Sequence, residues 1–271
     1  MTKITARILA SLTDNPMQPD FLIIGAQKAG TTSLYAYLTQ HPQILSAKEK
    51  EVHFFDLNFD RGTAWYESQF EIASSAQNLN HRSISGEATP YYLFHPCVPQ
   101  RVYNYLPQVK LIVLLRNPMV RAISHYHHEV RLGFEQLSIE QAIEQESTRL
   151  QGEVEKLLSD DNYYSYNHQH YSYLSRGIYI EQLKVWMSLF PKEQFLILSA
   201  EDLYSNPAAI FKQVLEFLNL PDYELKDYGK YNAGTEKNPS NHDLEQQLTN
   251  FFQPYNQQLN DFLGLDFNWD F

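Results

Sequence analysis

The stretch Phe21-Leu22-Ile23-Ile24-Gly25-Ala26-Gln27-Lys28-Ala29-Gly30-Thr31-Thr32-Ser33-Leu34 decides the fold. An apolar run of strand type leads into a glycine- and lysine-containing turn, and two threonines and a serine then open a helical pattern. The N-terminus of a helix offers unpaired N–H groups and the positive end of its dipole, and a lysine adds a full charge. The stretch therefore predicts a binding site for a phosphate-like anion, although an ordinary turn capped by Thr31 or Thr32 has a similar pattern.

The lysine of this turn does not occupy the Walker A position. The motif G-x-x-x-x-G-K-[ST] places its lysine directly after the second glycine, where it reaches the β and γ phosphates. Gly25 and Gly30 have the required separation, but Thr31 follows Gly30, and the lysine is Lys28 inside the loop. The cation is thereby shifted toward the first phosphate. This shift favours a single phosphate-type group over a nucleoside triphosphate.

The composition limits the compartment and the partners. The chain has 271 residues, 43% of them hydrophobic, and a formal net charge of −11. The acidic balance argues against nucleic acid as a partner and disfavours a polyanionic glycan acceptor. Cys97 is the single cysteine, and this favours a reducing compartment, so we expect a cytoplasmic protein. No apolar run is long enough to span a membrane, and residues 4–12 are more typical of a short amphipathic helix than of a signal peptide.

An acid and an imidazole follow shortly after the loop. If the segment around Glu51 and His53 is extended, the two side chains point the same way, because strand side chains repeat every two residues. Such a pair can act as a general base. A solvated Lys/Glu patch running into a core segment is the alternative interpretation.

Two further segments predict strands. Residues 83–87 form a short one, and residues 109–115 form a continuous apolar run typical of a parallel strand buried on both faces. The second run ends in Arg116-Asn117-Pro118, where Asn117 and Pro118 predict the start of a helix that continues to about His128 or Arg131. Arg116 therefore lies at the carboxyl end of a parallel strand, where open α/β sheets bind ligands. Ser124 lies about 10 Å along the following helix.

The rest of the chain predicts helices, one more strand and two loops. We expect a surface helix within 132–161, a Tyr- and His-rich loop over 161–173, helices over 177–190 and 208–218, a strand over 194–199, a polar loop over 229–240, and a final helix from about Asp243 with a kink or break at Pro254. The histidines at 125, 127, 128, 168 and 170 lack any recognised zinc spacing, so we expect no metal. Strands and helices alternate throughout. The predicted fold is a single α/β domain with a central parallel sheet, helices on both faces and a P-loop-like turn.

These motifs, in this order and spacing, resemble the sulfotransferases that use 3′-phosphoadenosine 5′-phosphosulfate, in the branch that contains the heparan sulfate sulfotransferases and bacterial relatives. Gly25 to Ser33 resembles the 5′-phosphosulfate loop, Glu51 to Asp56 the acid-bearing segment, and Arg116 with Ser124 the pair that holds the 3′-phosphate. Ser175 to Tyr179 and the stretch from Asn256 to Trp269 are also similar. The likeness covers residues 1–271, with about 1–19 as an N-terminal extension and about 132–175 as an acceptor-side insertion.

The resemblance implies a role for each matching residue. Lys28 would bind the 5′-phosphate and the leaving oxygen, and Ala29, Gly30, Thr31, Thr32 and Ser33 would donate hydrogen bonds to it. Arg116 and Ser124 would select the 3′-phosphate. Glu51 would be the base, with His53 as its helper or as an alternative base. Lys237, in the late polar loop, would close over the nucleotide.

One departure bears on the acceptor. Glycan-modifying relatives often carry a lysine at the position of Ala88, after the glutamate Glu87. The alanine in place of that lysine and the acidic composition favour a hydroxyl of a small, lipid or carrier-bound acceptor over a glycan or an amine. Two other functions remain open on the sequence alone: a kinase-like transferase of the P-loop type, and a non-catalytic nucleotide-binding scaffold.

Overall fold

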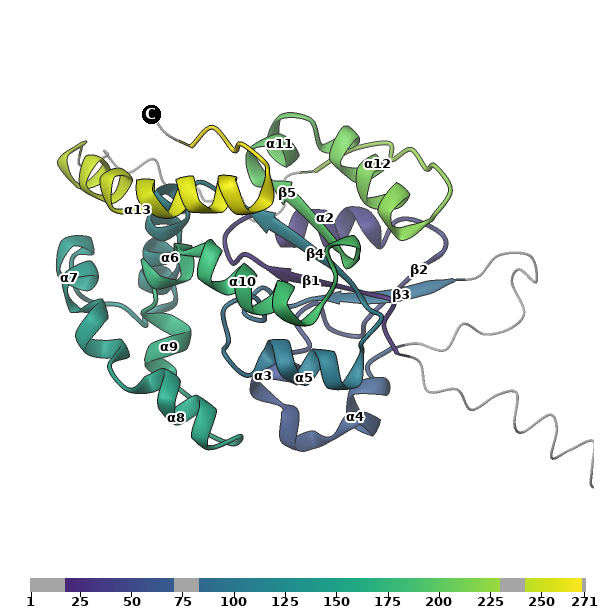
Figure 1. The fold of residues 1–271 in the computed structure, drawn as a ribbon. Coiled ribbons are helices and arrows are strands. Elements are labelled where there is room, and N and C mark those ends of the chain that lie inside the picture. The colour runs from purple at the N-terminus through teal and green to yellow at the C-terminus, as the bar shows by residue number, and fades with distance from the viewer. Residues whose placement is uncertain (1–17, 71–82, 230–241, 270–271) are drawn as a thin grey trace, which may run out of the picture.

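The computed structural model describes residues 18–70, 83–229 and 242–269. Five parallel strands form one sheet in the order β2-β3-β1-β4-β5 (Figure 1). Their bounds are β1 (Phe21–Gly25), β2 (Ile44–Ser46), β3 (Ile84–Ala88), β4 (Lys110–Leu115) and β5 (Phe195–Ser199). The central strand β1 is fully buried and lies between β3 and β4. The chain therefore changes direction along the sheet at β1, which places a ligand crevice at its carboxyl end.

Helices cover both faces of the sheet. Figure 1 shows α2 and α12 on one face and α5 and α10 on the other. The helices are α2 (Thr31–Leu38), α3 (Phe54–Leu57), α4 (Thr63–Glu67), α5 (Val98–Tyr105), α6 (Pro118–Leu132), α7 (Ile139–Leu150), α8 (Glu153–Ser159), α9 (Tyr166–His170), α10 (Tyr179–Leu189), α11 (Ala200–Ser205), α12 (Pro207–Leu218) and α13 (His242–Leu263), with short 3-10 turns η1 (Phe59–Arg61), η2 (Ser175–Gly177) and η3 (Lys192–Gln194). This arrangement confirms the predicted α/β class with a parallel sheet.

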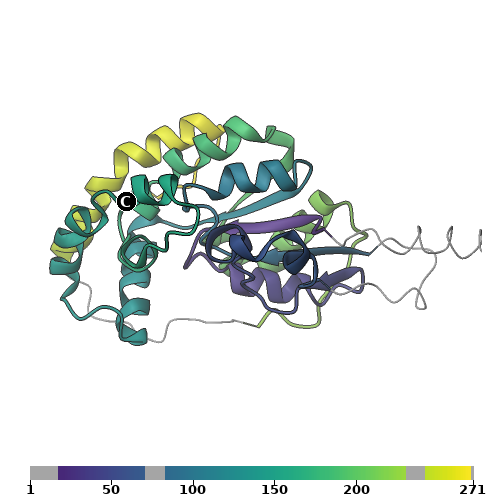
Figure 2. The same ribbon diagram turned by 90° about the horizontal axis from the view of Figure 1, so that it is seen from below.

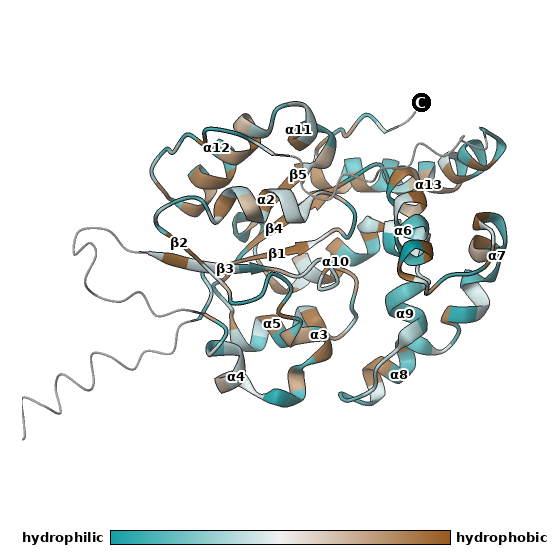
Figure 3. Cartoon of the chain, turned by 180° about the vertical axis from the view of Figure 1, so that it is seen from behind, coloured by the Kyte–Doolittle hydropathy of each residue, from teal (hydrophilic) through white to brown (hydrophobic). Residues whose placement is uncertain are grey.

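The helices α6 to α9 gather beyond the carboxyl ends of the strands (Figure 2). Figure 3 shows that they are mostly hydrophilic, whereas the strands are hydrophobic. The Glu146 carboxylate of α7 is buried and accepts hydrogen bonds from the backbone N–H groups of Leu174 and Ser175, at 2.6 and 2.8 Å. Polar contacts such as these therefore help to hold this part of the chain to the rest.

Local signals predicted most elements correctly. The Asn117 side chain caps α6 by accepting from the N–H groups of Met119 and Val120. Between residues 132 and 161, however, two helices replace the one expected, because Gly152 takes a left-handed backbone (φ 75°) between α7 and α8. The expected loop at 161–173 contains α9, and His168 within it is buried.

Three expectations about the chain ends had different outcomes. Of the kink or break expected at Pro254, the break is wrong, because Pro254 lies inside α13 and does not end it. The short helix at residues 4–12 and most of the polar loop at 229–240 lie outside the described residues. In the part of the chain that the structure describes, no helix is long and apolar enough to cross a membrane.

Candidate active site

The loop between β1 and α2 has the geometry of an anion site. Gly30 precedes the first turn of α2 in a left-handed conformation (φ 92°), and no side chain caps the helix there. A Cβ atom at Gly30 would lie 3.1 Å from Leu203 and 3.2 Å from the Tyr204 hydroxyl. Glycine therefore suits this position both for its left-handed backbone and for the lack of space. The N-terminus of α2 therefore has no side-chain cap, and a helix start of this kind suits an anionic ligand.

Lys28 and Arg116 meet at this loop. Arg116 follows β4 directly, and its Nη1 donates to the carbonyl oxygen of Lys28 at 2.9 Å. Burial, followed by the positive charges of Arg131 and Arg116, lowers the pKa of Lys28 to about 8. The charges of Glu129 and Glu51 oppose this effect, and the remaining cluster of positive charge favours an anionic ligand.

Ser124 and Arg131 lie on α6, the helix that starts beside Arg116. Ser124 is half-buried and Arg131 lies in the last turn. Because residues i, i+4 and i+7 share one face of a helix, Ser124, His128 and Arg131 line one side of α6. Arg131 Nη2 lies 2.8 Å from His128 Nδ1. Nothing in the sequence signalled that Arg131 would lie near Lys28.

A cleft of about 810 Å³ opens beside Arg116. Its lining includes Tyr204, whose ring lies 5.8 Å from the Arg116 guanidinium, and Trp269, which stacks on Phe267 at 4.4 Å. The lining also includes the acidic residues Glu201, Asp202 and Asp266. Aromatic walls next to Arg116 suit a phosphorylated nucleoside. A second cleft, of about 780 Å³, lies among Asp20, Lys110 and Pro221 and contains none of the predicted site residues.

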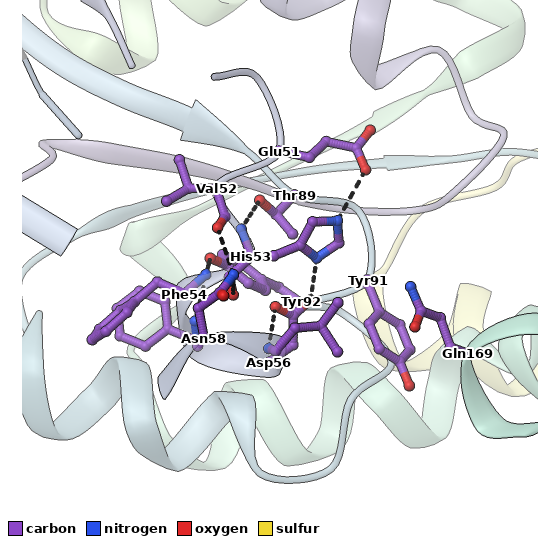
Figure 4. Close-up of polar contacts among 12 residues, drawn as sticks. Glu51, Val52, His53, Phe54, Asp56, Asn58, Thr89, Tyr91, Tyr92 and Gln169 are labelled. Carbon is purple, nitrogen blue, oxygen red and sulfur yellow. Dashed lines mark hydrogen bonds and ion pairs between the residues drawn. The ribbon is translucent and has the colours of Figure 1, made fainter. Parts of the chain in front are cut away.

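Glu51, His53 and Asp56 form a relay across one imidazole (Figure 4). The Nδ1 atom of His53 lies 2.8 Å from Asp56 Oδ2, and its Nε2 atom lies 3.4 Å from Glu51 Oε2. The Asp56 side chain is fully buried, whereas that of Glu51 is 42% exposed. The residues are not on an extended strand as expected. Instead His53 adopts a left-handed backbone (φ 51°) at the start of α3, which brings Asp56 back to its ring.

The two carboxylates set the protonation of the relay. Burial would lower the pKa of His53, but the hydrogen bonds to Asp56 and Glu51 outweigh it and raise that pKa to about 10. Burial would raise the pKa of Glu51, but the hydrogen bond from His53 and the charge of Lys50 outweigh it and lower that pKa to about 2. At neutral pH His53 is therefore an imidazolium and Glu51 a carboxylate.

A buried carboxyl group, Glu87, supports the turn beneath the relay. It accepts from the hydroxyls of Tyr66 and Thr89 at 2.7 Å and of Tyr92 at 3.1 Å. The Tyr92 oxygen in turn accepts from the backbone N–H of Phe54 at 2.9 Å. Glu87 thus fixes the backbone that carries His53. The sequence analysis named Asp56 and Glu87 as members of the two segments but predicted neither the bond to His53 nor the buried hydrogen bonds of Glu87.

The structure brings most of the predicted site residues together. Lys28, Ala29, Gly30, Thr31, Thr32 and Ser33 form the loop, Arg116 touches it, and the charge of Glu51 is close enough to act on Lys28. Lys237 lies outside the described residues. Of the histidines considered for zinc, His125 and His170 both pair with Glu129, and His168 pairs with the Tyr91 hydroxyl. Among the described residues, no three His, Cys, Asp or Glu side chains are grouped as metal ligands.

An anion loop follows the central strand of a parallel sheet, an arginine ends the next strand, and a carboxylate–imidazole pair lies nearby. This arrangement is that of a group-transfer enzyme with an α/β fold. The family model of the sulfotransferase domain matches residues 18–246. The chain belongs to the sulfotransferase family, as its motifs predicted, and is an enzyme of that family.

Individual proteins similar to this chain are also sulfotransferases. A membrane-associated sulfotransferase of Dictyostelium discoideum is 30% identical over 93% of this chain, which spans 66% of that protein. A mouse heparan sulfate glucosamine 3-O-sulfotransferase is 29% identical over 93% of this chain and 74% of its own length. In structure, the chain is similar to a sulfotransferase from Alicyclobacillus acidocaldarius, with 30% identity, a TM-score of 0.71, and coverage of 93% of this chain and 98% of the other.

Proposed function

We propose that this protein transfers a sulfuryl group from 3′-phosphoadenosine 5′-phosphosulfate to an acceptor hydroxyl. The observation that carries the proposal is the meeting of Lys28 and Arg116 at the loop before α2, with the exposed Glu51 carboxylate close by. Lys28 and the helix N-terminus suit a 5′-phosphosulfate, and Arg116 beside the aromatic cleft suits a 3′-phosphate and its nucleoside.

The roles of the residues follow from their charges. The donor supplies a phosphate leaving group, so the bond between sulfur and the bridging phosphate oxygen breaks as the acceptor oxygen bonds to sulfur. Lys28 and the first N–H groups of α2 offset the negative charge that develops on the phosphate. Positioning and charge stabilisation dominate such transfers, as they do for phosphoryl groups.

The base in this proposal is Glu51. Its carboxylate is ionised and exposed, so it can take the proton of an acceptor hydroxyl, whereas His53 already carries a proton on both nitrogens. His53 holds the Glu51 carboxylate in place, and Asp56 holds His53. His53 would replace Glu51 as base only if it first lost a proton.

The acceptor and the compartment are part of the same proposal. The net charge of −11 and the buried Ala88 favour a hydroxyl on a small, lipid or carrier-bound molecule over a polyanionic glycan or an amine. Residues of the 132–175 insertion would line its site. The lone Cys97 favours the cytoplasm.

The donor is tested by calorimetric titration with 3′-phosphoadenosine 5′-phosphate, AMP, and ATP with magnesium. We expect the 3′-phosphorylated nucleotide to bind at least tenfold, about 1.4 kcal/mol, more tightly than AMP. Tighter binding of ATP with magnesium would support a kinase-like transferase instead. Transfer of labelled sulfate from the donor to a panel of phenols, lipids, sugars and carrier-bound chains then identifies the acceptor. Binding without transfer to any of them would favour a scaffold.

A further inference from the structure

Arg176 is a buried arginine that joins three parts of the chain. It lies in η2 and is only 2% exposed. Its Nη2 donates to the carbonyl oxygens of His168 and Gln169 at 3.1 and 2.8 Å, and its Nε donates to Ser172 Oγ at 3.1 Å. Its Nη1 donates to Gln27 Oε1 at 2.5 Å. One guanidinium thus links the end of the insertion to the residue before Lys28.

Aromatic rings rather than carboxylates surround this cation. The guanidinium carbon lies 4.8 Å from the centre of the Tyr91 ring and 5.0 Å from that of Phe94. Tyr91 and Gln169, which lie side by side in Figure 4, both contact Arg176. Within the described ranges, Arg176 has no carboxylate partner at ion-pair distance. Burial lowers its pKa to about 10, so it stays charged at neutral pH.

The contact with Gln27 fixes one side chain of the donor loop. A carboxamide has its acceptor oxygen on one side and its two N–H donors on the other. Because Arg176 holds the oxygen, the N–H donors of Gln27 must point away from the guanidinium. A planar, multidentate donor such as arginine can hold this amide and three insertion oxygens at once, whereas a lysine ammonium cannot keep that geometry.

We propose that Arg176 is a positioning residue for sulfuryl transfer: it orients the Gln27 carboxamide toward the anionic donor on the loop, and it makes that orientation depend on the docked insertion. This inference rests on the proposed function. Lys28 binds the donor by charge and is not held by Arg176. Loss of Arg176 should therefore impair the chemical step more than it weakens nucleotide binding.

The test compares Arg176→Lys, Gln27→Ala and the double variant. We expect each single change to lower kcat about tenfold or more, and the double variant to match Gln27→Ala, because Arg176 acts through Gln27. The Kd for 3′-phosphoadenosine 5′-phosphate should change less than about threefold. Losses that multiply in the double variant, or a kcat unchanged in Arg176→Lys, would overturn the proposal.

Arg149→Lys is the matched control. Arg149 holds parts of the insertion to one another, through Glu135 and the Tyr171 ring, and these contacts do not include the donor loop. We expect its loss to lower the melting temperature while kcat per nucleotide-binding site stays within about twofold. An equal loss of kcat in this control would mean that Arg176 acts only through the stability of the insertion.

A measurement without substrate separates this inference from the proposed function. The Gln27 side-chain amide signals, identified by their absence in Gln27→Ala, should show restricted motion by heteronuclear NOE in the wild type and in Arg149→Lys, and free motion in Arg176→Lys. A Gln27 amide that stays rigid in Arg176→Lys refutes the positioning role. If the wild type binds no 3′-phosphorylated nucleotide, the proposed function fails even when the Gln27 amide behaves as expected.

Discussion

The donor loop and the Glu51–Asp56 relay lie in one site but are built in opposite ways. The donor loop is cationic, and its geometry comes from a contiguous strand, turn and helix plus one arginine at the end of the neighbouring strand. The relay has two carboxylates around one imidazolium, and it depends on side chains that fold back onto each other. The first half is made largely by the backbone, the second by side-chain contacts.

This difference separates binding from chemistry. A loop with a lysine, an arginine and a helix N-terminus attracts an anion whether or not a reaction follows. A carboxylate that is held ionised beside an imidazolium matters only when a proton must move. Variants of the relay should therefore affect turnover, and variants of the donor loop should affect binding first.

The largest expected effect comes from Glu51→Gln. The amide keeps the shape of the side chain but cannot accept a proton, so kcat should fall by about 10²- to 10⁴-fold. The Kd for 3′-phosphoadenosine 5′-phosphate should change far less than kcat, because Glu51 affects the donor loop only through its charge on Lys28. Steady-state kinetics and calorimetry on the same preparation measure both. Retained activity would remove Glu51 as the base and promote His53.

Arg116→Ala tests whether the donor loop and its arginine act in nucleotide binding. Loss of a charge-assisted hydrogen bond costs about 1.5–3 kcal/mol, so 3′-phosphoadenosine 5′-phosphate should bind about 10- to 100-fold more weakly. AMP, which lacks the 3′-phosphate, should lose much less. Calorimetry with both nucleotides measures the difference. If both lose affinity equally, Arg116 supports the loop through its bond to the Lys28 carbonyl and does not read the 3′-phosphate.

The sequence predicted the donor half well because its signals are local. The buried strand, the glycine turn and the helix start are adjacent in the chain, and the run Arg116-Asn117-Pro118 ends one element and begins the next. The short strand β2 was missed, because three residues carry too little pattern to detect. The order of the strands depends on packing between distant segments and had no local signal.

The relay was predicted in its residues but not in its geometry. Glu51 and His53 were chosen correctly as neighbours, but the reason, an extended segment, was wrong, since His53 adopts a left-handed backbone. That conformation is what brings Asp56 to Nδ1. The bond between Arg176 and Gln27 spans 149 residues of sequence, and no periodic pattern could have revealed it.

Asp56→Asn should give a smaller, more specific effect. The amide removes the charge that does most to keep His53 protonated, so the His53 pKa should fall from about 10 toward its ordinary value. We expect kcat to fall about tenfold, the cost of one hydrogen bond to a charged group. NMR titration of the His53 ring follows the pKa directly.

Asp56→Asn should also change how the stability of the protein depends on pH. A histidine whose pKa is raised on folding stabilises the protein fully below its unfolded pKa of about 6.5, and this contribution is lost as pH rises toward 10. The His53 contribution to the free energy of unfolding should therefore decline between about pH 6.5 and 10. The difference between wild type and Asp56→Asn isolates this contribution from that of Lys28, whose lowered pKa has the opposite sign. The stability of the wild type should fall relative to that of Asp56→Asn as pH rises. An identical slope would mean that Asp56 does not control the protonation of His53.

The smallest effect concerns the pH dependence of nucleotide binding. The pKa of Lys28 is about 8 in the free protein, so Lys28 loses its charge as pH rises above 8, and a bound anion should raise that pKa again. Affinity for 3′-phosphoadenosine 5′-phosphate should therefore fall about fivefold from pH 7 to pH 9, with proton uptake on binding near pH 9. Calorimetry in two buffers of different ionisation enthalpy measures both quantities. In Lys28→Met the affinity should be lower and this pH dependence should vanish. If it persists in Lys28→Met, a different group titrates, and the donor loop would resemble the relay in depending on contacts between side chains for its charge.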